Sequence, residues 1–342
     1  MSLYGLILAG GSGTRLWPLS REKSPKFLLA PENRESFLEL TIRRFQPLIS
    51  LKKIRIVCGE MHVQPIRQQL RFLKKENFIT EPSARNTAPA IGLAVIRILQ
   101  EDPDAILVVL PADHLISDTK KFRKCLQAAI HQAKKKEVLV TVGVVPTKPH
   151  TGYGYIERGQ KKIGGDIFEV NRFVEKPNLK TAKRYLKSRR YFWNAGIFVG
   201  RASLFLREFR RHMPNLYRGL VKISRTKKIH SIYKNLESQS IDYGVMEKSR
   251  CLAIVPGCFE WRDVGDLVEL SKLSNSKNGI HLHSRNVTVL GQERFVVTLG
   301  VKDLIVVESG DALLIVNKES VQDVKKIVSV LKTLGKKGRM YV

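Results

Sequence analysis

Short apolar runs recur through residues 1–145 and predict the strands of a buried sheet. Leu3 to Leu8 is nearly all apolar and far too short to span a membrane, so we expect it to be a buried strand. Ala105 to Leu110 is continuously apolar, as expected in a parallel sheet that is covered on both faces. Similar runs predict further strands at residues 54–58, 78–80 and 138–145.

Segments with helical spacing lie between these strands. Ser36 and Glu39 form a capping box, which predicts a helix through about Phe45. The spacing of apolar residues also predicts helices at 63–73, 88–99 and 120–134. Alternating strands and helices are typical of βαβ units, so the pattern predicts an α/β fold with a doubly wound, mostly parallel sheet. In such sheets ligands bind beyond the carboxyl ends of the strands.

This alternation stops after residue 145. Thr151 to Ile156 and Phe168 to Pro177 are expected to be paired strands with a glycine turn between them. Helices are predicted at 181–187 and over most of 202–248, and strands at 193–199 and 251–255. The string F-E-W-R-D-V-G at 259–265 is expected to be an acidic loop.

The pattern of apolar and turn residues changes again near Asn278. Short β-rich pieces are separated by turn residues at close intervals, which suggests a small all-β unit. A terminal helix is predicted from Ser320 to about Leu334. We therefore expect two domains, residues 1–275 and a small β domain with a terminal helix at 276–342.

A glycine-rich turn directly follows the first predicted strand, with glycines at positions 10, 11 and 13. Glycine lets the backbone turn sharply and leaves N–H groups free to point at an anion. Three cations that can neutralise phosphate oxygens come next: Arg15, Lys23 and Lys26. These features together describe a cradle for a triphosphate, with a tight strand–helix turn and solvated charges as the alternative.

The turn differs from the two common nucleotide-binding motifs. A Walker loop needs a Gly-Lys pair that the string lacks. A dinucleotide fingerprint needs a third glycine where Leu16 stands.

The chain is strongly basic, with 60 Lys and Arg against 31 Asp and Glu and a formal net charge of +29. Such a charge raises the local concentration of anionic partners. The basic residues are spread along the chain, and no zinc-finger spacing or aromatic RNA-binding signature accompanies them. We therefore favour a generally basic surface over a nucleic-acid site.

The cysteines and the N-terminus indicate a cytoplasmic, reduced protein. The four cysteines show no C-x-x-C spacing and are too few for a disulfide framework. The first apolar run has no basic segment ahead of it, and no stretch reaches the length of a membrane helix.

The string G-G-S-G-T-R-L-W-P-L-S at 10–20, followed by K-S-P-K-F-L at 23–28, resembles the signature of the sugar-phosphate nucleotidyltransferases. Its form is similar to that of the mannose-1-phosphate guanylyltransferase branch. The resemblance continues motif by motif over nearly the whole chain. It implies a Rossmann-like catalytic domain at 1–275 and a short left-handed β-helix at the C-terminus, where relatives form homodimers. Bifunctional relatives carry a phosphomannose isomerase domain beyond this point, so we expect that second activity to be absent.

The resemblance implies transfer of GMP from GTP to α-D-mannose 1-phosphate, giving GDP-mannose and pyrophosphate. The attacking phosphate oxygen is already ionised near neutral pH, because its second pKa is about 6, so no general base is needed. Catalysis would consist of in-line positioning and charge neutralisation. Arg15 and Lys26 would hold the departing pyrophosphate. His114 is expected to be structural.

Asp113, at the end of a predicted strand, and Asp263 match the metal-binding aspartates of the family. Chemistry on a triphosphate needs a hard cation, usually Mg²⁺, held by one or two carboxylates. Taken singly, each aspartate could instead be a helix cap. The resemblance places the remaining nucleotide contacts at Leu8, Ala9, Gly10, Gly11, Gly13, Thr14, Arg85, Asn86 and Thr87.

Glu175 and Lys176 lie in F-V-E-K-P, which matches the sugar-phosphate motif of the family. A carboxylate can accept hydrogen bonds from sugar hydroxyls, and a neighbouring lysine can meet the phosphate. Gly154 and Asn194 would complete this site, and for Asp242 an ordinary structural role is an equal alternative.

Guanine recognition is expected in E-P-S-A-R-N-T-A-P-A at 81–90, which matches the guanylyltransferases and departs from the uridylyl and thymidylyl branches. Asn86 and Thr87 are the expected base contacts, with Arg85 toward phosphate. Ala84 stands where relatives commonly have glycine. The sequence leaves three alternatives: another sugar-phosphate nucleotidyltransferase, a non-catalytic regulatory homologue, and a nucleic-acid-binding protein.

Overall fold

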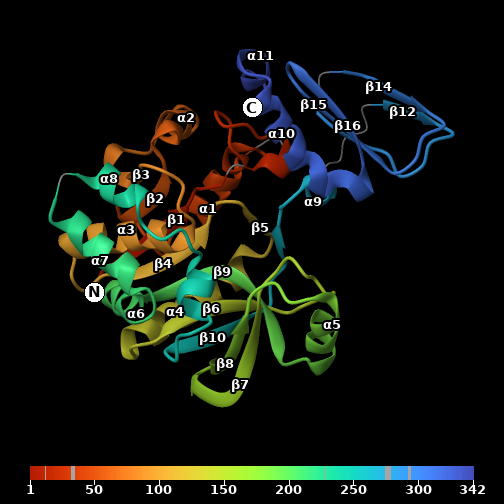
Figure 1. The fold of residues 1–342 in the computed structure, drawn as a ribbon. Helices are drawn as coiled ribbons and strands as arrows, with labels where there is room; N and C mark the ends of the chain where they lie inside the picture. Colours follow the sequence, from red (N-terminus) through yellow and green to blue (C-terminus); the bar gives the residue numbers. More distant parts are fainter. Residues whose placement is uncertain (12, 32–34, 227, 274–278, 292–293) are drawn as a thin grey trace.

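The computed structural model describes residues 1–11, 13–31, 35–226, 228–273, 279–291 and 294–342. Its centre is a twisted nine-stranded sheet with helices on both faces (Figure 1). In order across the sheet, the strands are β3 (Phe78–Glu81), β2 (Ile54–Gly59), β1 (Leu3–Leu8), β4 (Ile106–Pro111), β9 (Tyr191–Arg201), β6 (Leu139–Val144), β10 (Leu252–Gly257), β8 (Ile167–Val174) and β7 (Tyr155–Gly164).

The sheet is mixed, which corrects the prediction of a mostly parallel one. Four neighbouring pairs are parallel, β1–β2, β2–β3, β1–β4 and β6–β10, and four are antiparallel, β4–β9, β6–β9, β8–β10 and β7–β8. Two of the antiparallel pairs arise because β9 inserts between β4 and β6 and runs against both. The other two involve β8, which runs against β10 on one side and β7 on the other. A strand buried on both faces has the same apolar run in either direction, so the pattern of residues does not reveal this reversal.

Successive side chains of each strand point to opposite faces of the sheet and therefore pack into two separate cores. Ile7 belongs to the core beneath one set of helices, and Leu6 to the core on the other face. The first set is α1 (Phe37–Phe45), α2 (Val63–Gln69), α4 (Thr119–Lys135) and α5 (Leu179–Ser188). The second set is α3 (Thr87–Glu101), α6 (Ala202–His212), α7 (Pro214–Ser224) and α8 (Ile229–Lys234).

Most predicted elements are present, with some boundaries moved. The N-cap half of the predicted capping box is confirmed, because the side chain of Ser36 accepts the N–H of Glu39 at the start of α1. Residues 151–154 are not part of a strand, and β7 begins only at Tyr155. The predicted acidic loop contains a strand, β11 (Trp261–Asp263), which pairs with β5 (His114–Ile116).

The C-terminal unit is built from short strands, as predicted. β12 (Gly279–Leu282) is parallel to β14 (Val296–Leu299), and β13 (Thr288–Leu290) is parallel to β15 (Leu304–Ser309), which pairs antiparallel with β16 (Ala312–Asn317). The 3₁₀ segment η7 (Lys318–Asp323) leads into α10 (Val324–Thr333), so the helix begins later than predicted, and α11 (Lys336–Arg339) follows. The predicted domain boundary at 275/276 lies outside the described residues.

The C-terminal unit packs against the segment that follows the glycine turn (Figure 1). Leu16 and Trp17 share a core with Ile305 and Val328, and the indole of Trp17 donates to the carbonyl of Tyr341 at 2.7 Å. All four cysteines are free thiols. No helix in the described ranges is long and apolar enough to cross a membrane.

Candidate active site

The glycine turn connects β1 to a short 3₁₀ helix, η1 (Thr14–Leu16). Gly11 and Gly13 have φ of +95° and +55°, which favour glycine. A β-carbon on Gly13 would also lie only 2.3 Å from the hydroxyl of Ser20, so no larger residue fits without rearrangement. Ala9 is buried below the turn, where its N–H donates to Val57.

Two strand pairings bring Asp113 and Asp263 to this turn. The register of β1 and β4 places Leu8 opposite Pro111, so the chain after β4 emerges beside the glycines. The β5–β11 pairing then sets Asp263 opposite His114, next to Asp113. The carboxylates are thus neighbours although they are far apart in the sequence.

Lys26 links the two aspartates. It lies in the 3₁₀ segment η2 (Lys26–Leu28), and its ammonium donates to Asp113 Oδ2 at 2.7 Å and to Asp263 Oδ1 at 3.3 Å. Burial lowers the pKa of Lys26, but the charges of Asp113 and Asp263 outweigh it and leave the pKa raised. For Asp113, burial acts to raise the pKa, and the nearby Lys26 reverses the effect so that the pKa is lowered. Lys26 and Asp113 are therefore both charged.

A cavity of about 310 Å³ opens over this arrangement. It brings together the predicted glycines, Thr14, two of the three predicted cations and both aspartates. The third predicted cation, Lys23, does not line it, and neither do Leu8 and Ala9. Two residues not predicted for the site also line it, Phe27 and Gly265. The sequence signal for Gly265 was its place in F-E-W-R-D-V-G, two residues after the metal-binding candidate Asp263. The cavity is lined by Gly10, Gly11, Gly13, Thr14, Arg15, Lys26, Phe27, Asp113, Asp263 and Gly265.

The two carboxylates offer the type of ligand atom, oxygen, that Mg²⁺ binds. Mg²⁺ prefers oxygen ligands and is often held by one or two carboxylates together with substrate phosphates. Asp113 and Asp263 share a single ammonium, so their negative charge is directed at one point that a cation already occupies. Across the described ranges no group of three or more His, Cys, Asp or Glu side chains is placed to hold a metal. The assignment of Mg²⁺ to this pair stays a prediction, and the two carboxylates are ligands that fit it.

His114 has the structural role that was expected of it. It accepts the indole N–H of Trp261 at 3.2 Å, across the β5–β11 pair. Burial lowers the pKa of His114, which favours the neutral ring that can accept this bond.

The predicted base-binding residues lie at the start of α3. Asn86 is its N-cap, and its side-chain oxygen accepts the N–H of Thr87 at 2.9 Å. The hydroxyl of Thr87 accepts the N–H of Ile241 at 2.9 Å, which leaves its O–H donor and one lone pair for a contact to a base. Arg85 donates to the carbonyl of Lys234. Neither these residues nor the sugar group below line the 310 Å³ cavity.

The predicted sugar-phosphate residues form a compact cluster of their own. Asn194 donates to Asp242 Oδ1 at 2.8 Å, and Lys176 pairs with Glu175 Oε1 at 2.5 Å. The other carboxylate oxygen of Glu175 is buried and, among the described residues, has no hydrogen-bond partner. A β-carbon on Gly154 would lie 2.2 Å from that same oxygen. The cluster therefore holds a buried acceptor without a partner among the described residues, and any side chain at position 154 would collide with it.

Two features of this cluster were not predicted from the sequence. Glu247 accepts the backbone N–H of Glu175 at 2.8 Å and so anchors the motif. Burial and the charge of Glu175 raise the pKa of Asp242 to about 6. Glu247 lies in the motif-like string S-I-D-Y-G-V-M-E-K at 240–248, and this string is the sequence signal that could have identified it.

Comparison with known proteins gives the same class as the fold and the cradle, a nucleotidyltransferase. Residues 4–278 match the nucleotidyl transferase family, and residues 277–331 match the MannoseP isomerase/GMP-like β-helix domain. The mannose-1-phosphate guanylyltransferase of Salmonella muenchen is 41% identical over 96% of this chain and 73% of its own length. That of Escherichia coli K12 is 39% identical over 98% of this chain and 74% of its own length.

The crystal structure of mannose-1-phosphate geranyltransferase from Thermus thermophilus superposes with a TM-score of 0.88 at 33% identity, covering 97% of this chain and 100% of that one. The chain belongs to the nucleotidyl transferase family and, within it, to the mannose-1-phosphate guanylyltransferases. The β-helix match supports the predicted C-terminal subfold, and its left-handed sense stays a prediction.

Proposed function

We propose that this chain transfers GMP from GTP to α-D-mannose 1-phosphate, giving GDP-mannose and pyrophosphate. The observation that carries the proposal is the convergence of Lys26, Asp113 and Asp263 over the glycine turn. The same activity is named for relatives that align over nearly the whole chain. All four residues that a non-catalytic homologue would be expected to lose, Arg15, Lys26, Asp113 and Asp263, are present.

The glycine turn would bind the triphosphate through its backbone N–H groups. Arg15 and Lys26 line the cavity and would neutralise the departing pyrophosphate, Lys26 by exchanging an aspartate for a phosphate oxygen. Bound Mg²⁺, held by Asp113 and Asp263, would offset the charge on the reacting phosphates. No side chain has to remove a proton, because the attacking phosphate of the sugar is ionised above its second pKa of about 6. Attack at the α-phosphorus then forms the new P–O bond as the bond to pyrophosphate breaks.

The second substrate would be held by the cluster around Glu175. Its buried free oxygen would accept sugar hydroxyls, and the half-exposed Lys176 would meet the sugar phosphate. Asn194 and Asp242 would orient the sugar ring through those of their polar atoms that are not used in the hydrogen bond between them.

Base selection would rest on the segment before α3. Asn86 is exposed and has φ of 68°, a conformation that its own capping bond supports. A site built for the guanine edge leaves polar groups unpaired when adenine or uracil enters, which costs roughly 1–3 kcal/mol for each group. Asn86→Ala is therefore expected to reduce the preference for GTP, chiefly through poorer use of GTP.

We also propose a homodimer through the C-terminal unit. Ile280 and Leu282 of β12 are about half exposed, and in the parallel register they lie beside Val297 and Leu299 of β14, which are also exposed. Neighbouring apolar side chains on one sheet are typical of an interaction surface. Sedimentation of wild type and Leu299→Lys tests this proposal, because the variant is expected to be monomeric and a monomeric wild type would contradict it.

The decisive experiment measures pyrophosphate release across GTP, ATP, UTP and dTTP with several sugar 1-phosphates. GTP with mannose 1-phosphate is expected to give the highest kcat/KM. Lys26→Ala is expected to impair the use of GTP and Lys176→Ala the use of mannose 1-phosphate. Equal use of another nucleotide would refute the guanine assignment. The same shift of both KM values in both variants would refute the division of roles.

A further inference from the structure

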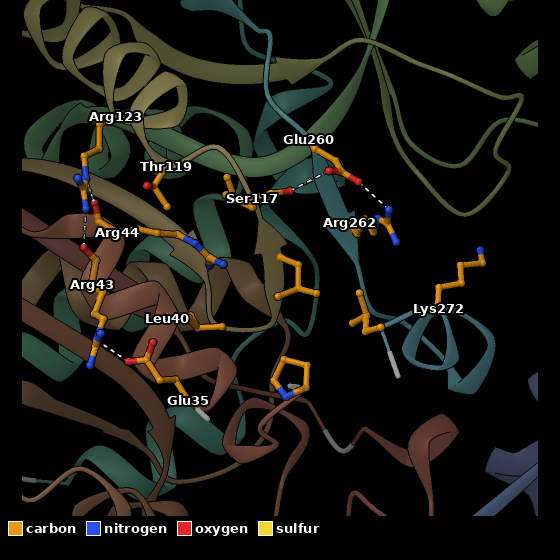
Figure 2. A pocket seen from close by; sticks show the side chains of 14 residues that line it. Glu35, Leu40, Arg43, Arg44, Ser117, Thr119, Arg123, Glu260, Arg262 and Lys272 are labelled. Atoms are coloured by element: carbon orange, nitrogen blue, oxygen red, sulfur yellow. Dashed lines mark hydrogen bonds and ion pairs between the residues drawn. The ribbon is translucent and has the colours of Figure 1, made fainter. Parts of the chain in front are cut away.

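A second cavity, larger than the active-site cavity and sharing no residue with it, lies beside α1 (Figure 2). Its volume is about 710 Å³, within the usual range for small-molecule sites. α1, the β5–β11 pair, the start of α4 and the segment after α9 (Leu267–Ser271) surround it. Five cationic side chains line it: Arg43, Arg44, Arg123, Arg262 and Lys272. Only two acidic side chains, Glu35 and Glu260, are among its lining residues.

Arg44 is the unusual member of this lining. Its side chain points toward the middle of the cavity in Figure 2, although the residue is only 3% exposed. Its guanidinium donates to the hydroxyl of Thr41 at 3.0 Å, and no described carboxylate pairs with it. Burial lowers the pKa of Arg44 to about 10. A buried guanidinium with a single neutral acceptor leaves most of its donors unused, which is costly unless an anion joins it.

The other cations of the cavity differ in whether their charge is balanced. Arg262 pairs with Glu260 at 2.6 Å, and Arg43 pairs with Glu35 at 2.5 Å. Lys272 likewise pairs with a neighbouring glutamate of α9. Arg123 instead donates to backbone carbonyls at the end of α1, and no ion pair is formed with it in the described part of the chain. Two guanidinium groups, those of Arg44 and Arg123, therefore remain uncompensated beside one cavity.

We propose that this cavity is a second anion-binding site, separate from the active site, for a small phosphate-bearing molecule. Guanidinium groups match the geometry of phosphate oxygens and bind them with charge-assisted hydrogen bonds. Arg44 would supply the buried contact and Arg123 the outer one. The cavity has room for more than a bare phosphate, so a phosphate ester with a polar body also fits its volume.

Calorimetric titration of the full chain tests this site, with inorganic phosphate and a hexose 6-phosphate as separate probes. Lys26→Ala serves as the background, because under the proposed function it is expected to weaken phosphate binding in the active-site cradle. Arg44→Gln and Arg123→Gln are compared in that background with Lys124→Gln, which removes one exposed charge from α4 outside the cavity. Arg123→Gln is included because a change at the buried Arg44 could impair folding.

At least one probe is expected to bind in the Lys26→Ala background. Arg123→Gln and Arg44→Gln should each weaken it by about tenfold or more, the effect of losing a hydrogen bond to a charged group. Lys124→Gln should leave the affinity unchanged. Binding of inorganic phosphate would show that the phosphate group is sufficient. Binding of the hexose 6-phosphate but not of inorganic phosphate would show that the hexose also contacts the cavity. Failure of both probes to bind, or an affinity that Arg123→Gln does not change, overturns the proposal.

Discussion

Replacing Gly154 with alanine tests the sugar site at its narrowest point. The added β-carbon would lie 2.2 Å from Glu175 Oε2 and 3.2 Å from Cβ of Asn194. A carbon and an oxygen in contact need about 3 Å or more, so the carboxylate has to move away from its present position. Gly154 does not have a left-handed φ, so alanine itself is compatible with the backbone there.

The expected loss is confined to the binding of mannose 1-phosphate. A hydrogen bond to a charged group contributes about 1.5–3 kcal/mol, so losing the one expected at the free oxygen of Glu175 raises KM for the sugar about tenfold to 150-fold. The KM for GTP should stay unchanged, because Gly154 does not line the cavity at the glycine turn. The free energy of unfolding should change little, because the gain of about 0.4–1 kcal/mol from restricting the unfolded chain is opposed by the cost of displacing the Glu175 carboxylate.

Initial rates of pyrophosphate release measure both KM values, each with the other substrate saturating. Gly59→Ala is a matched control, because its β-carbon would make only an ordinary contact, 3.5 Å from His62, at the end of β2. An unchanged KM for mannose 1-phosphate in Gly154→Ala would refute the role given to Glu175. An equal rise in both KM values would show that the change disturbs the whole active site.

Three further predictions concern charge and backbone. Asp113→Asn and Asp263→Asn should each lower turnover about 100-fold or more with the circular dichroism spectrum intact, because each removes one anionic oxygen; near-normal turnover at saturating Mg²⁺ would contradict this. The pKa of Asp242 is raised to about 6, so its contribution to stability is present below pH 4 and is lost as the pH rises through 6. Asp242→Asn should abolish this loss, so at pH 7 its free energy of unfolding in urea should exceed that of wild type by about 3 kcal/mol at most. Parallel pH profiles of stability for the variant and wild type would refute this. Gly13→Ala should destabilise the fold by about 1–3 kcal/mol, and Ser20→Ala in the same chain should recover only part of this, because the strain of φ +55° remains; equal stability of Gly13→Ala and wild type would be the contrary result.

The strands and helices of the first half could be predicted because their signals are local. The helix cap at Ser36 and the apolar runs at Leu3–Leu8 and Ile106–Pro111 depend only on neighbouring residues. The strand character of Trp261–Asp263 was missed because its pairing partner, His114–Ile116, is far away in the sequence. Direction was also missed, since an apolar run fits a parallel and an antiparallel strand equally.

The sequence by itself determined the chemical groups of this protein: the glycine turn, the cations after it, the aspartates and the Glu175-Lys176 pair. Only the tertiary structure decided how these groups meet. The β1–β4 and β5–β11 registers set Asp113 and Asp263 around one ammonium, and the turn at Gly154 leaves one oxygen of Glu175 free. The charge balance around Arg44 is likewise a property of packing, because burial and the absence of a described acidic partner depend on residues distant in the chain. Local patterns specify which atoms a segment offers, whereas distances between segments follow from strand pairing and from the packing of the cores.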